Sequence, residues 1–197
     1  MKRYIWPVVW GFLVAFVLGY LLRQLELAAG EPLGFWGKWS PFVFGFLTFF
    51  LLANLAGNRK VKNASVSERA AVLNAPPPEG KILLVVFREG FIGMAAGLNV
   101  TVDGVVRAQL KSPRFTVLTL DPGRHEVNAG FGGLAGAQNN QGAYVFDAKP
   151  GEVVAVRATL SMGALKNTVK LEEAGDIDAV RAKLARMTMV KPEVGAT

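Results

Sequence analysis

The residue types that most often act as general acids, bases or nucleophiles occur in this chain without the neighbours that such chemistry requires. His125, the only histidine, is adjacent to Glu126 and follows Asp121 by four positions. Adjacent side chains on a strand point to opposite faces, so His125 and Glu126 do not form an acid–base pair. The serines at positions 65, 67, 112 and 161 lack the Gly-x-Ser-x-Gly context of a nucleophile elbow. We therefore expect no catalytic residues and no enzyme activity, and we assign His125 a structural role beside a turn.

Metal and cofactor sites are not predicted either. The chain has no cysteine and one histidine, which excludes thiolate centres and imidazole-rich centres. The acidic pairs Glu172-Glu173 and Asp176/Asp178 have no further ligands near them in sequence, and they fit a loop and a helix start. The glycine-rich residues 130–136 lack the Gly-Lys-Ser/Thr of a phosphate-binding loop. We expect neither a bound metal nor a cofactor.

One stretch, residues 130–142, is a candidate recognition loop. It is longer than a β-hairpin requires, and loops beyond the minimal length often carry function. Its small residues are interspersed with amide side chains and two apolar side chains. The predicted partner-binding residues are Phe131, Leu134, Gln138, Asn139, Asn140 and Gln141. A flexible hairpin loop without a binding role is the alternative.

The elements that position these residues are of two kinds, because the apolar residues are unevenly distributed. All four tryptophans and most phenylalanines precede Asn58. Residues 4–22 contain no charged residue, and an α-helix needs about 20 apolar residues to cross a bilayer. Residues 41–56 form a second, shorter uncharged run. We predict a transmembrane helical hairpin within residues 1–57, with spans near 4–22 and 41–56.

A cleaved secretory signal is the alternative for the first run, because Lys2 and Arg3 make a basic start. The run exceeds the about 7–15 apolar residues of such a signal. No small-residue cleavage site ends it, and a second span comes after it. We therefore favour the membrane hairpin.

The distribution of lysine and arginine predicts the orientation of the hairpin. Basic residues are more numerous at the outer ends of the two spans than in the connection between the spans. The flanking residues are Lys2, Arg3, Arg59, Lys60, Lys62 and Arg69, against Arg23 and Lys38 in the connection. We expect both termini in the cytoplasm and a multi-pass location in a bacterial inner membrane. The net charge of +7 is then explained by topology, and we expect no nucleic-acid partner.

Residues 58–80 indicate a linker between the hairpin and the β-rich residues after Lys81. They are polar and end in Pro76-Pro77-Pro78, which favours an extended spacer. Residues 67–73 can form a short helix, and an unstructured connector is the alternative. We expect a fragment that begins at Lys81 to fold by itself as a β-rich domain.

Residues 81–172 alternate between short β-rich runs and turn signals, which is typical of a small antiparallel β-sandwich. The continuous apolar run 82–87 suits a strand that is buried on both faces. Runs 98–102 and 105–110 flank Asp103-Gly104, where glycine accepts the positive φ of a type I′ turn. Further strands are predicted at 115–120, 125–127, 144–146, 153–160 and 168–171. Asp121-Pro122-Gly123 and Lys149-Pro150-Gly151 mark tight turns.

These turns give the domain a resemblance to PEGA-type β-sandwich domains, particularly the uncharacterised relatives in bacterial envelope lipoproteins. The resemblance covers residues 81–171. It rests on Val100-Thr101-Val102-Asp103-Gly104, Asp121-Pro122-Gly123-Arg124-His125 and Lys149-Pro150-Gly151-Glu152. It implies a non-catalytic module on a membrane-associated or secreted protein. The chain lacks the cysteine that those lipoproteins lipidate, and the two-helix anchor takes the place of the lipid.

Residues 173–197 are predicted to form a C-terminal amphipathic helix and tail. Ile177, Val180, Leu184 and Met187 recur at helical spacing after Asp176, the predicted N-cap. This helix either packs on the sandwich with a solvated basic face or lies on an anionic leaflet. We favour packing on the sandwich.

The sequence thus predicts a membrane-anchored α+β protein with a transmembrane helical hairpin, a small antiparallel β-sandwich and a C-terminal amphipathic helix. We expect a non-enzymatic inner-membrane scaffold or accessory subunit of a membrane complex. Its expected partners are the lipid bilayer and either another protein or a second copy of the chain. The alternative is an envelope-facing module that binds glycan or cell-wall material, which a periplasmic domain would favour.

Overall fold

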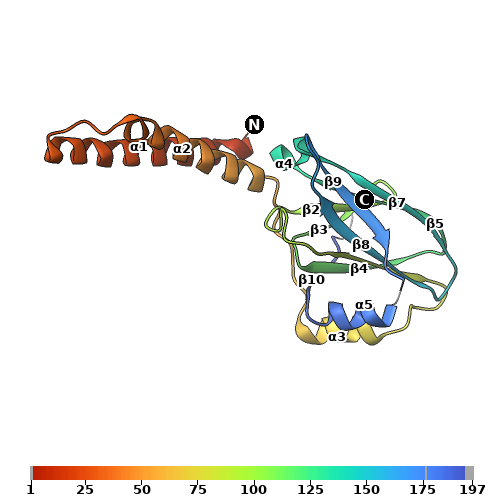
Figure 1. Ribbon diagram of the computed structural model, residues 1–197. Coiled ribbons are helices and arrows are strands. Elements are labelled where there is room, and N and C mark those ends of the chain that lie inside the picture. Colours follow the sequence, from red (N-terminus) through yellow and green to blue (C-terminus); the bar gives the residue numbers. More distant parts are fainter. Residues whose placement is uncertain (1, 176, 194–197) are drawn as a thin grey trace. The chain divides into compact units, whose positions relative to one another are not determined.

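The computed structural model describes residues 2–175 and 177–193, and the chain divides into two compact units after Gly57. The first unit is helical, whereas the second contains two β-sheets and short helices (Figure 1). The division coincides with the change from long uncharged runs to short runs separated by turn residues. The chain is therefore α+β, as the sequence predicts.

Two long helices make up the first unit. After the 3-10 helix η1 (Lys2–Tyr4), α1 spans Ile5–Ala29 and α2 spans Phe35–Leu55. By length and composition both are apolar enough to cross a membrane. Both extend into residues 23–40, which the hydropathy pattern assigns to the connection. Hydropathy marks where charged residues begin, but helical hydrogen bonding continues to Gly30, whose φ of +71° ends α1.

Small residues line the contact between α1 and α2. A Cβ atom added to Gly45 would lie 2.6 Å from the carbonyl oxygen of Gly11 and 2.8 Å from the Cβ atom of Ala15. Further along α1, a Cβ atom on Gly19 would lie 3.8 Å from the ring of Pro41. The two backbones therefore approach closely at Gly11 and Gly45, as in tightly packed pairs of membrane helices.

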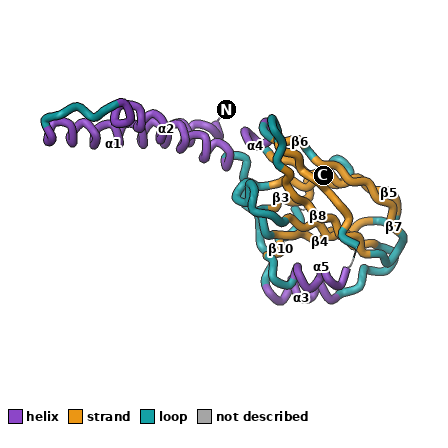
Figure 2. The backbone as a smooth tube through the Cα atoms, in the orientation of Figure 1, coloured by secondary structure: helices purple, strands orange, loops and turns teal. Residues whose placement is uncertain are grey.

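The second unit contains a six-stranded sheet and a four-stranded sheet. In spatial order, the six-stranded sheet consists of β10 (Thr188–Met189), β4 (Arg114–Leu120), β1 (Ile82–Arg88), β8 (Val153–Ser161), β9 (Asn167–Glu173) and β6 (Asn139–Asn140). The four-stranded sheet consists of β3 (Val105–Leu110), β2 (Leu98–Val102), β5 (Gly123–Phe131) and β7 (Gly142–Ala148). Figure 2 shows the strands of this unit together with their connecting loops.

The β2–β3 connection is the two-residue turn that the sequence predicts. Asp103 has a φ of +51° and Gly104 a φ of +78°, and a type I′ turn requires both to be positive. The Asp103 carboxylate accepts a hydrogen bond of 3.0 Å from the backbone N–H of Glu126. This bond helps to hold a non-glycine residue in the left-handed region.

The six-stranded sheet is mixed, whereas the turn motifs predict an antiparallel sandwich. β1 pairs antiparallel with β4 and parallel with β8, so that Val85 lies opposite both Val117 and Ala155. The pairs β6–β9 and β10–β4 are also parallel. Turn motifs determine the pairing of strands that are neighbours in sequence. β1 and β8 are distant in sequence, so no local signal reports their direction.

Every residue of β1 is buried, as its unbroken apolar run predicts. Its even-numbered residues from 82 to 86 join a core cluster that includes residues of both sheets. Its odd-numbered residues from 83 to 87 join a second cluster on the other face. Two helices, α3 (Val66–Asn74) and α5 (Ile177–Leu184), contribute to this second cluster and lie side by side in Figure 2.

Residues 58–80, predicted as a linker, lie within the second unit. The backbone N–H of Ala64 donates to the carbonyl oxygen of Met189 at 2.9 Å, and Asn63 forms a β-bridge with Val190. A capping box begins α3, because the Ser65 hydroxyl accepts from Glu68 N–H at 3.1 Å and the Glu68 carboxylate accepts from Ser65 N–H at 2.8 Å. These residues are thus part of the folded unit. Their partners come from the C-terminal residues, which local composition does not reveal.

The C-terminal helix is shorter than predicted. α5 ends at Leu184, and Met187 lies beyond it but is buried in the same cluster. After α5 the chain forms β10, which pairs with β4 instead of continuing the helical hydrogen bonds. Val180 and Leu184 are buried against the six-stranded sheet, which is the packing that the sequence favours. The predicted N-cap, Asp176, lies outside the described residues.

Candidate functional site

The six predicted partner-binding residues lie on consecutive short elements instead of one open loop. Phe131 ends β5, Leu134 lies on α4 (Gly133–Ala137), Gln138 follows α4, Asn139 and Asn140 form β6, and Gln141 precedes β7. Phe131 is only 8% exposed. Leu134, Gln138 and Asn139 are half-buried, and Asn140 and Gln141 are exposed. The two polar residues at positions 140 and 141 are therefore the members most accessible to a partner.

The same segment is attached to its neighbours by hydrogen bonds. The Asn139 side-chain amide donates to the carbonyl oxygen of Ala135 at 2.5 Å, and Asn167 N–H donates to the carbonyl oxygen of Gln138 at 3.2 Å. Pairing with β9 satisfies backbone groups that an open loop would leave to water. The long loop that the sequence predicts is thus a short helix and a strand pair. Phe131 belongs to the core and is not a surface contact.

A buried arginine that no sequence motif marks organises this end of the unit. Arg88, the last residue of β1, is 2% exposed. Its guanidinium donates to the carbonyl oxygens of Gly93 at 2.7 Å, Ala96 at 2.5 Å and Leu110 at 3.0 Å. It also lies 4.9 Å from the ring centroid of Phe131. The only sequence signal for this role is a charged residue directly at the end of an apolar strand.

Burial lowers the pKa of Arg88 to about 10. The guanidinium is therefore still protonated at neutral pH, and its charge is balanced by three carbonyl dipoles and one aromatic face. Hydrogen bonds to a charged donor are stronger than those between neutral groups. Arg88 thus fixes the backbone that follows β1.

Two connections at this end expose large hydrophobic side chains. We call the β1–β2 connection (residues 89–97) and the β8–β9 connection (residues 162–166) the apolar loops. Their exposed hydrophobic residues are Phe91, Ile92, Met94, Met162 and Leu165. Leu165 is 99% exposed, Phe91 84% and Met162 74%. Elsewhere in the described part of this unit, the exposed large hydrophobic residues are all valines.

The sheet register places both apolar loops at one end of the unit. Arg88 pairs with Ala158 near the end of β8, so β1 and β8 run side by side toward the two loops. A Cβ atom on Gly93 of the first loop would lie 3.4 Å from the Leu160 side chain. The turns at Gly104, Gly123 and Gly151 lie at the other ends of the strands. The unit therefore has an apolar end and a polar end.

His125 lies at the polar end. Its Nδ1 is 2.7 Å from a carboxylate oxygen of Asp103, and its Nε2 is 2.8 Å from the carbonyl oxygen of Asp121. Both ring nitrogens are therefore engaged by the two neighbouring turns. Burial by itself would lower the pKa of His125, but the hydrogen bonds to Asp103 and Asp121 outweigh it, and the pKa is raised. This geometry supports a structural role for His125.

We expect His125→Ala to flatten the pH dependence of stability above about pH 6.5, the unfolded pKa of histidine. A histidine whose folded pKa is raised stabilises the fold fully below its unfolded pKa of about 6.5, and this stabilisation is lost as the pH rises through the folded pKa. Because the Asp103 side chain is 47% exposed, the effect is about 1 kcal/mol or less. Thermal unfolding of the detergent-solubilised chain, followed between about pH 5.5 and pH 8.5, measures it. Identical pH profiles for the variant and the wild type would contradict this assignment.

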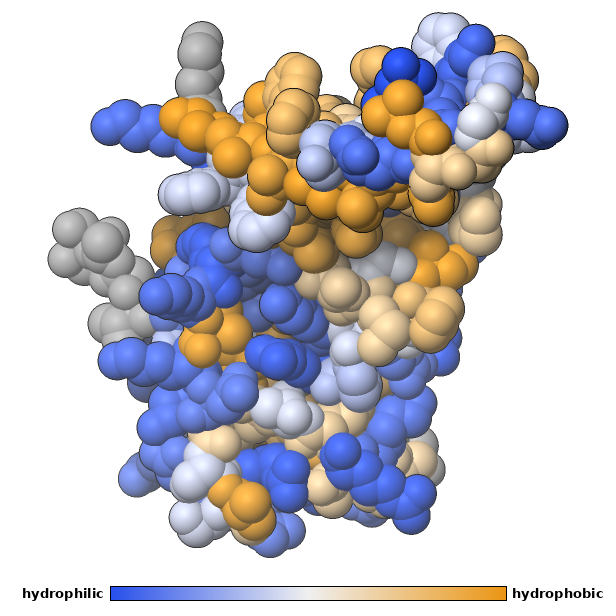
Figure 3. All heavy atoms as spheres, turned by 90° about the vertical axis from the view of Figure 1, so that its left-hand side faces the viewer, coloured by the Kyte–Doolittle hydropathy of each residue, from blue (hydrophilic) through white to orange (hydrophobic). Residues whose placement is uncertain are grey.

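The first unit is apolar on its outside. Phe12, Phe16, Trp36 and Phe46 are among its most exposed side chains. In the space-filling view of Figure 3, exposed hydrophobic residues gather in one region of the visible surface, and hydrophilic residues cover most of the remainder. An apolar surface of this kind needs an apolar environment to cover it.

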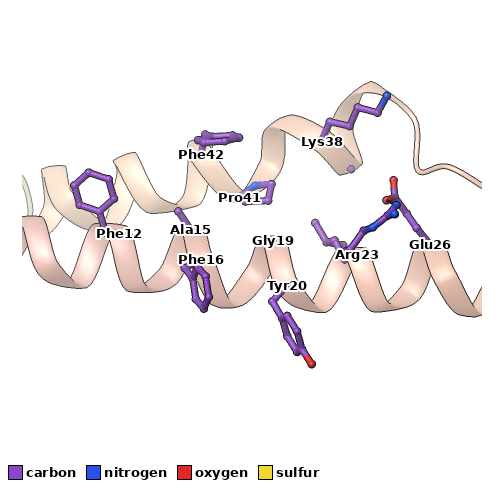
Figure 4. Close-up of a pocket in the computed structure, with 12 residues that line it drawn as sticks. Phe12, Ala15, Phe16, Gly19, Tyr20, Arg23, Glu26, Lys38, Pro41 and Phe42 are labelled. Atoms are coloured by element: carbon purple, nitrogen blue, oxygen red, sulfur yellow. Dashed lines mark hydrogen bonds and ion pairs between the residues drawn. The ribbon is translucent and has the colours of Figure 1, made fainter.

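A groove of about 580 Å³ lies along α1 and α2 (Figure 4). Aromatic side chains such as Phe12 and Phe42 line it, and Figure 4 shows Phe16 and Tyr20 pointing away from α2. Arg23 lies 3.0 Å from a carboxylate oxygen of Glu26 at the end where the helices are joined. The groove is thus apolar along its length and charged at one end.

The chain enters the second unit through a hydrogen-bonded junction. The Asn58 side chain donates to the carbonyl oxygen of Ala95 at 3.0 Å and accepts from Gly97 N–H at 2.6 Å. The backbone N–H of Arg59 donates to the side-chain oxygen of Gln109, a buried residue, at 2.6 Å. Residue 58 therefore lies on the first apolar loop, and the chain enters this unit at its apolar end.

No protein-family model matches the chain, and a comparison with curated proteins finds no match. The candidate functional residues are therefore identified from the geometry of this chain alone. They are the apolar loops, the groove along the hairpin, and the exposed residues at positions 140 and 141.

Proposed function

We propose that the chain is a non-enzymatic integral membrane protein in which α1 and α2 cross the bilayer and anchor a β-sandwich interaction module. The observation that carries this proposal is the packing of the hairpin, with small residues such as Gly11 and Gly45 inside and large apolar residues outside. Soluble monomers rarely expose apolar surfaces of this extent, whereas lipid covers them readily. At 25 residues, α1 is about 38 Å long and exceeds the about 30 Å hydrocarbon core.

The β-sandwich part of the proposal rests on the two sheets and the core cluster that they share. Leu84 and Val156 of the six-stranded sheet are buried in the same cluster as Val100 and Val127 of the four-stranded sheet. We propose the PEGA-type assignment on the strength of the turn motifs alone. The engagement of both His125 nitrogens supports a non-catalytic module.

The proposed role is that of a scaffold or accessory subunit of a membrane complex. The groove along α1 and α2 offers an apolar surface to a neighbouring membrane helix, either from a second copy or from another protein. The proposed location is a bacterial inner membrane with both termini in the cytoplasm, because basic residues flank the outer ends of the spans.

Extraction and topology reporters test this function. We expect the full chain to stay with membranes in high salt and in alkaline carbonate, and to be released by detergent, because two spans bury too much apolar surface for peripheral release. Reporters fused after Thr197 should be cytoplasmic, and a reporter inserted at Gly30 should be external.

Two outcomes would contradict these expectations differently. Release by carbonate would refute the membrane hairpin. Alkaline phosphatase activity in the fusion after Thr197 would reverse the orientation, and it would make an envelope-facing module for glycan or cell-wall material the better function.

A further inference from the structure

The connections at the apolar end of the β unit carry few acidic residues. Within residues 89–97, 111–113, 132–141 and 161–167, all of which the structure describes, Glu89 is the one acidic residue. Glu89 is already paired with Lys183 at 2.7 Å and with Arg157 at 3.4 Å. Lys111 and Lys166 lie in the same connections. This end therefore combines exposed apolar residues with basic residues.

The polar end carries charges of both signs in its turns, Lys149 among them. Its turns carry Glu79, Asp103, Asp121 and Glu152, and the large apolar residues of the apolar loops have no counterpart among them. Exposed hydrophobic residues larger than valine are thus segregated at one end of the strands. Segregation of this kind, with lysine beside aromatic and aliphatic side chains, is typical of protein surfaces that meet a lipid headgroup layer.

The first apolar loop is held in place by hydrogen bonds. Arg88 binds the backbone of the first loop through the carbonyl oxygens of Gly93 and Ala96. Ser112 N–H donates to the carbonyl oxygen of Met94 at 3.1 Å. Asn58 binds the same loop at Ala95 and Gly97. Phe91 is therefore exposed on a loop whose backbone is bound at Gly93, Ala96 and Gly97.

A short stretch of chain joins α2 to the first residue of the β unit. Asn58 follows Leu55, the last residue of α2, by three positions, and three residues span at most about 10 Å. Asn58 is itself hydrogen-bonded to the first apolar loop. The length of this connection therefore permits the apolar loops to contact a bilayer that contains α2.

We propose that the apolar loops dock into the headgroup layer of the bilayer that holds the hairpin, with Phe91, Met162 and Leu165 inserted between lipids. Lys111 and Lys166 then lie at the level of the lipid phosphates and favour an anionic leaflet. This inference rests on the proposed function, because it requires the hairpin to be in the membrane. It adds a second, monotopic contact that fixes the orientation of the β unit on the membrane surface.

The absence of cysteine from the sequence makes a direct test possible. Single-cysteine variants of the full chain are labelled with an environment-sensitive fluorophore and reconstituted into phosphatidylcholine vesicles with and without phosphatidylglycerol. Leu165→Cys and Phe91→Cys report on the apolar loops. Lys149→Cys, in a turn at the polar end, is the matched exposed control. Phe12→Cys, on the outside of α1, reports on the hairpin.

We expect lipids with a nitroxide near the top of the acyl chain to quench the labels at positions 91 and 165 at least about threefold more than the label at position 149, because monotopic contacts reach about 5–10 Å into the interface. Lys166→Gln, combined with Leu165→Cys, should reduce the additional quenching that phosphatidylglycerol produces. Equal quenching at positions 149 and 165, with strong quenching at position 12, would overturn the docking but leave the anchor intact.

Two other outcomes would also decide the matter. Shielding of the label at position 165 that grows with protein density in the vesicles, without nitroxide quenching, would identify a second copy as the occupant and overturn lipid docking. Absence of quenching at position 12 would overturn the membrane anchor itself, and the docking inference with it.

Discussion

A fragment of residues 81–197 is expected to unfold about 10–15 °C below a fragment of residues 58–197. The shorter fragment lacks α3, whose Val72 and Leu73 cover the second core cluster on the outer face of the six-stranded sheet. Burial of a valine or leucine side chain contributes about 1.5–3 kcal/mol when complete, and these two are half-buried. The fragment also loses the hydrogen bond between Ala64 and Met189 that supports β10.

Thermal unfolding followed by circular dichroism measures this difference. The matched control is made in the longer fragment, where Val72→Ser with Leu73→Ser should lower the midpoint and Ala71→Ser, on the exposed side of α3, should leave it nearly unchanged. Equal midpoints for the two fragments would mean that residues 58–80 act as a tether, as the composition of the segment suggests.

Arg88→Met is expected to lower the free energy of unfolding of the 58–197 fragment by about 3 kcal/mol, because it leaves three carbonyl oxygens without their charged donor. Methionine has nearly the length of the arginine stem, so the loss arises from hydrogen bonding and not from an empty volume. Arg88→Lys should recover part of the stability, since an ammonium group cannot reach all three acceptors at once.

Urea unfolding measures this effect, with Arg124→Met as the control. Arg124 lies exposed on β5, and its substitution should change the free energy of unfolding by about 0.5 kcal/mol or less. The same urea midpoint for Arg88→Met and Arg124→Met would show that Arg88 is not required to hold the first apolar loop.

The sequence predicted the elements whose signals are local. The apolar run of β1, the hairpin of β2 and β3 around Asp103-Gly104, and two helices long enough to span a membrane are all present in the structure. Each depends on residues within one turn or one strand, where periodicity, glycine conformation and charge act directly. The sequence also predicted that His125 and Glu126 do not form a pair, because adjacent side chains on a strand face opposite sides. His125 contacts Asp103 and Asp121 instead.

The candidate functional residues were harder to predict from the sequence. Of the predicted contacts, Phe131 is in the core, and the amide residues beside it are partly held by β9. The apolar loops share no sequence signal, because Phe91 and Leu165 are far apart in the chain and each is unremarkable alone. Their common position results only from the parallel pairing of β1 with β8.

The sequence by itself determined which segments are apolar enough to leave water, where the chain turns, and which strands form hairpins. The tertiary structure alone decided that residues 58–64 pair with the residues after α5 and that Arg88 is buried. It also decided that the exposed hydrophobic residues larger than valine in the β unit share one end. The physical reason is that hydrogen bonds and burial join groups that are close in space, whatever their distance in sequence. The backbone groups of a polar segment can bond to water or to a distant strand equally well until the fold brings that strand beside them.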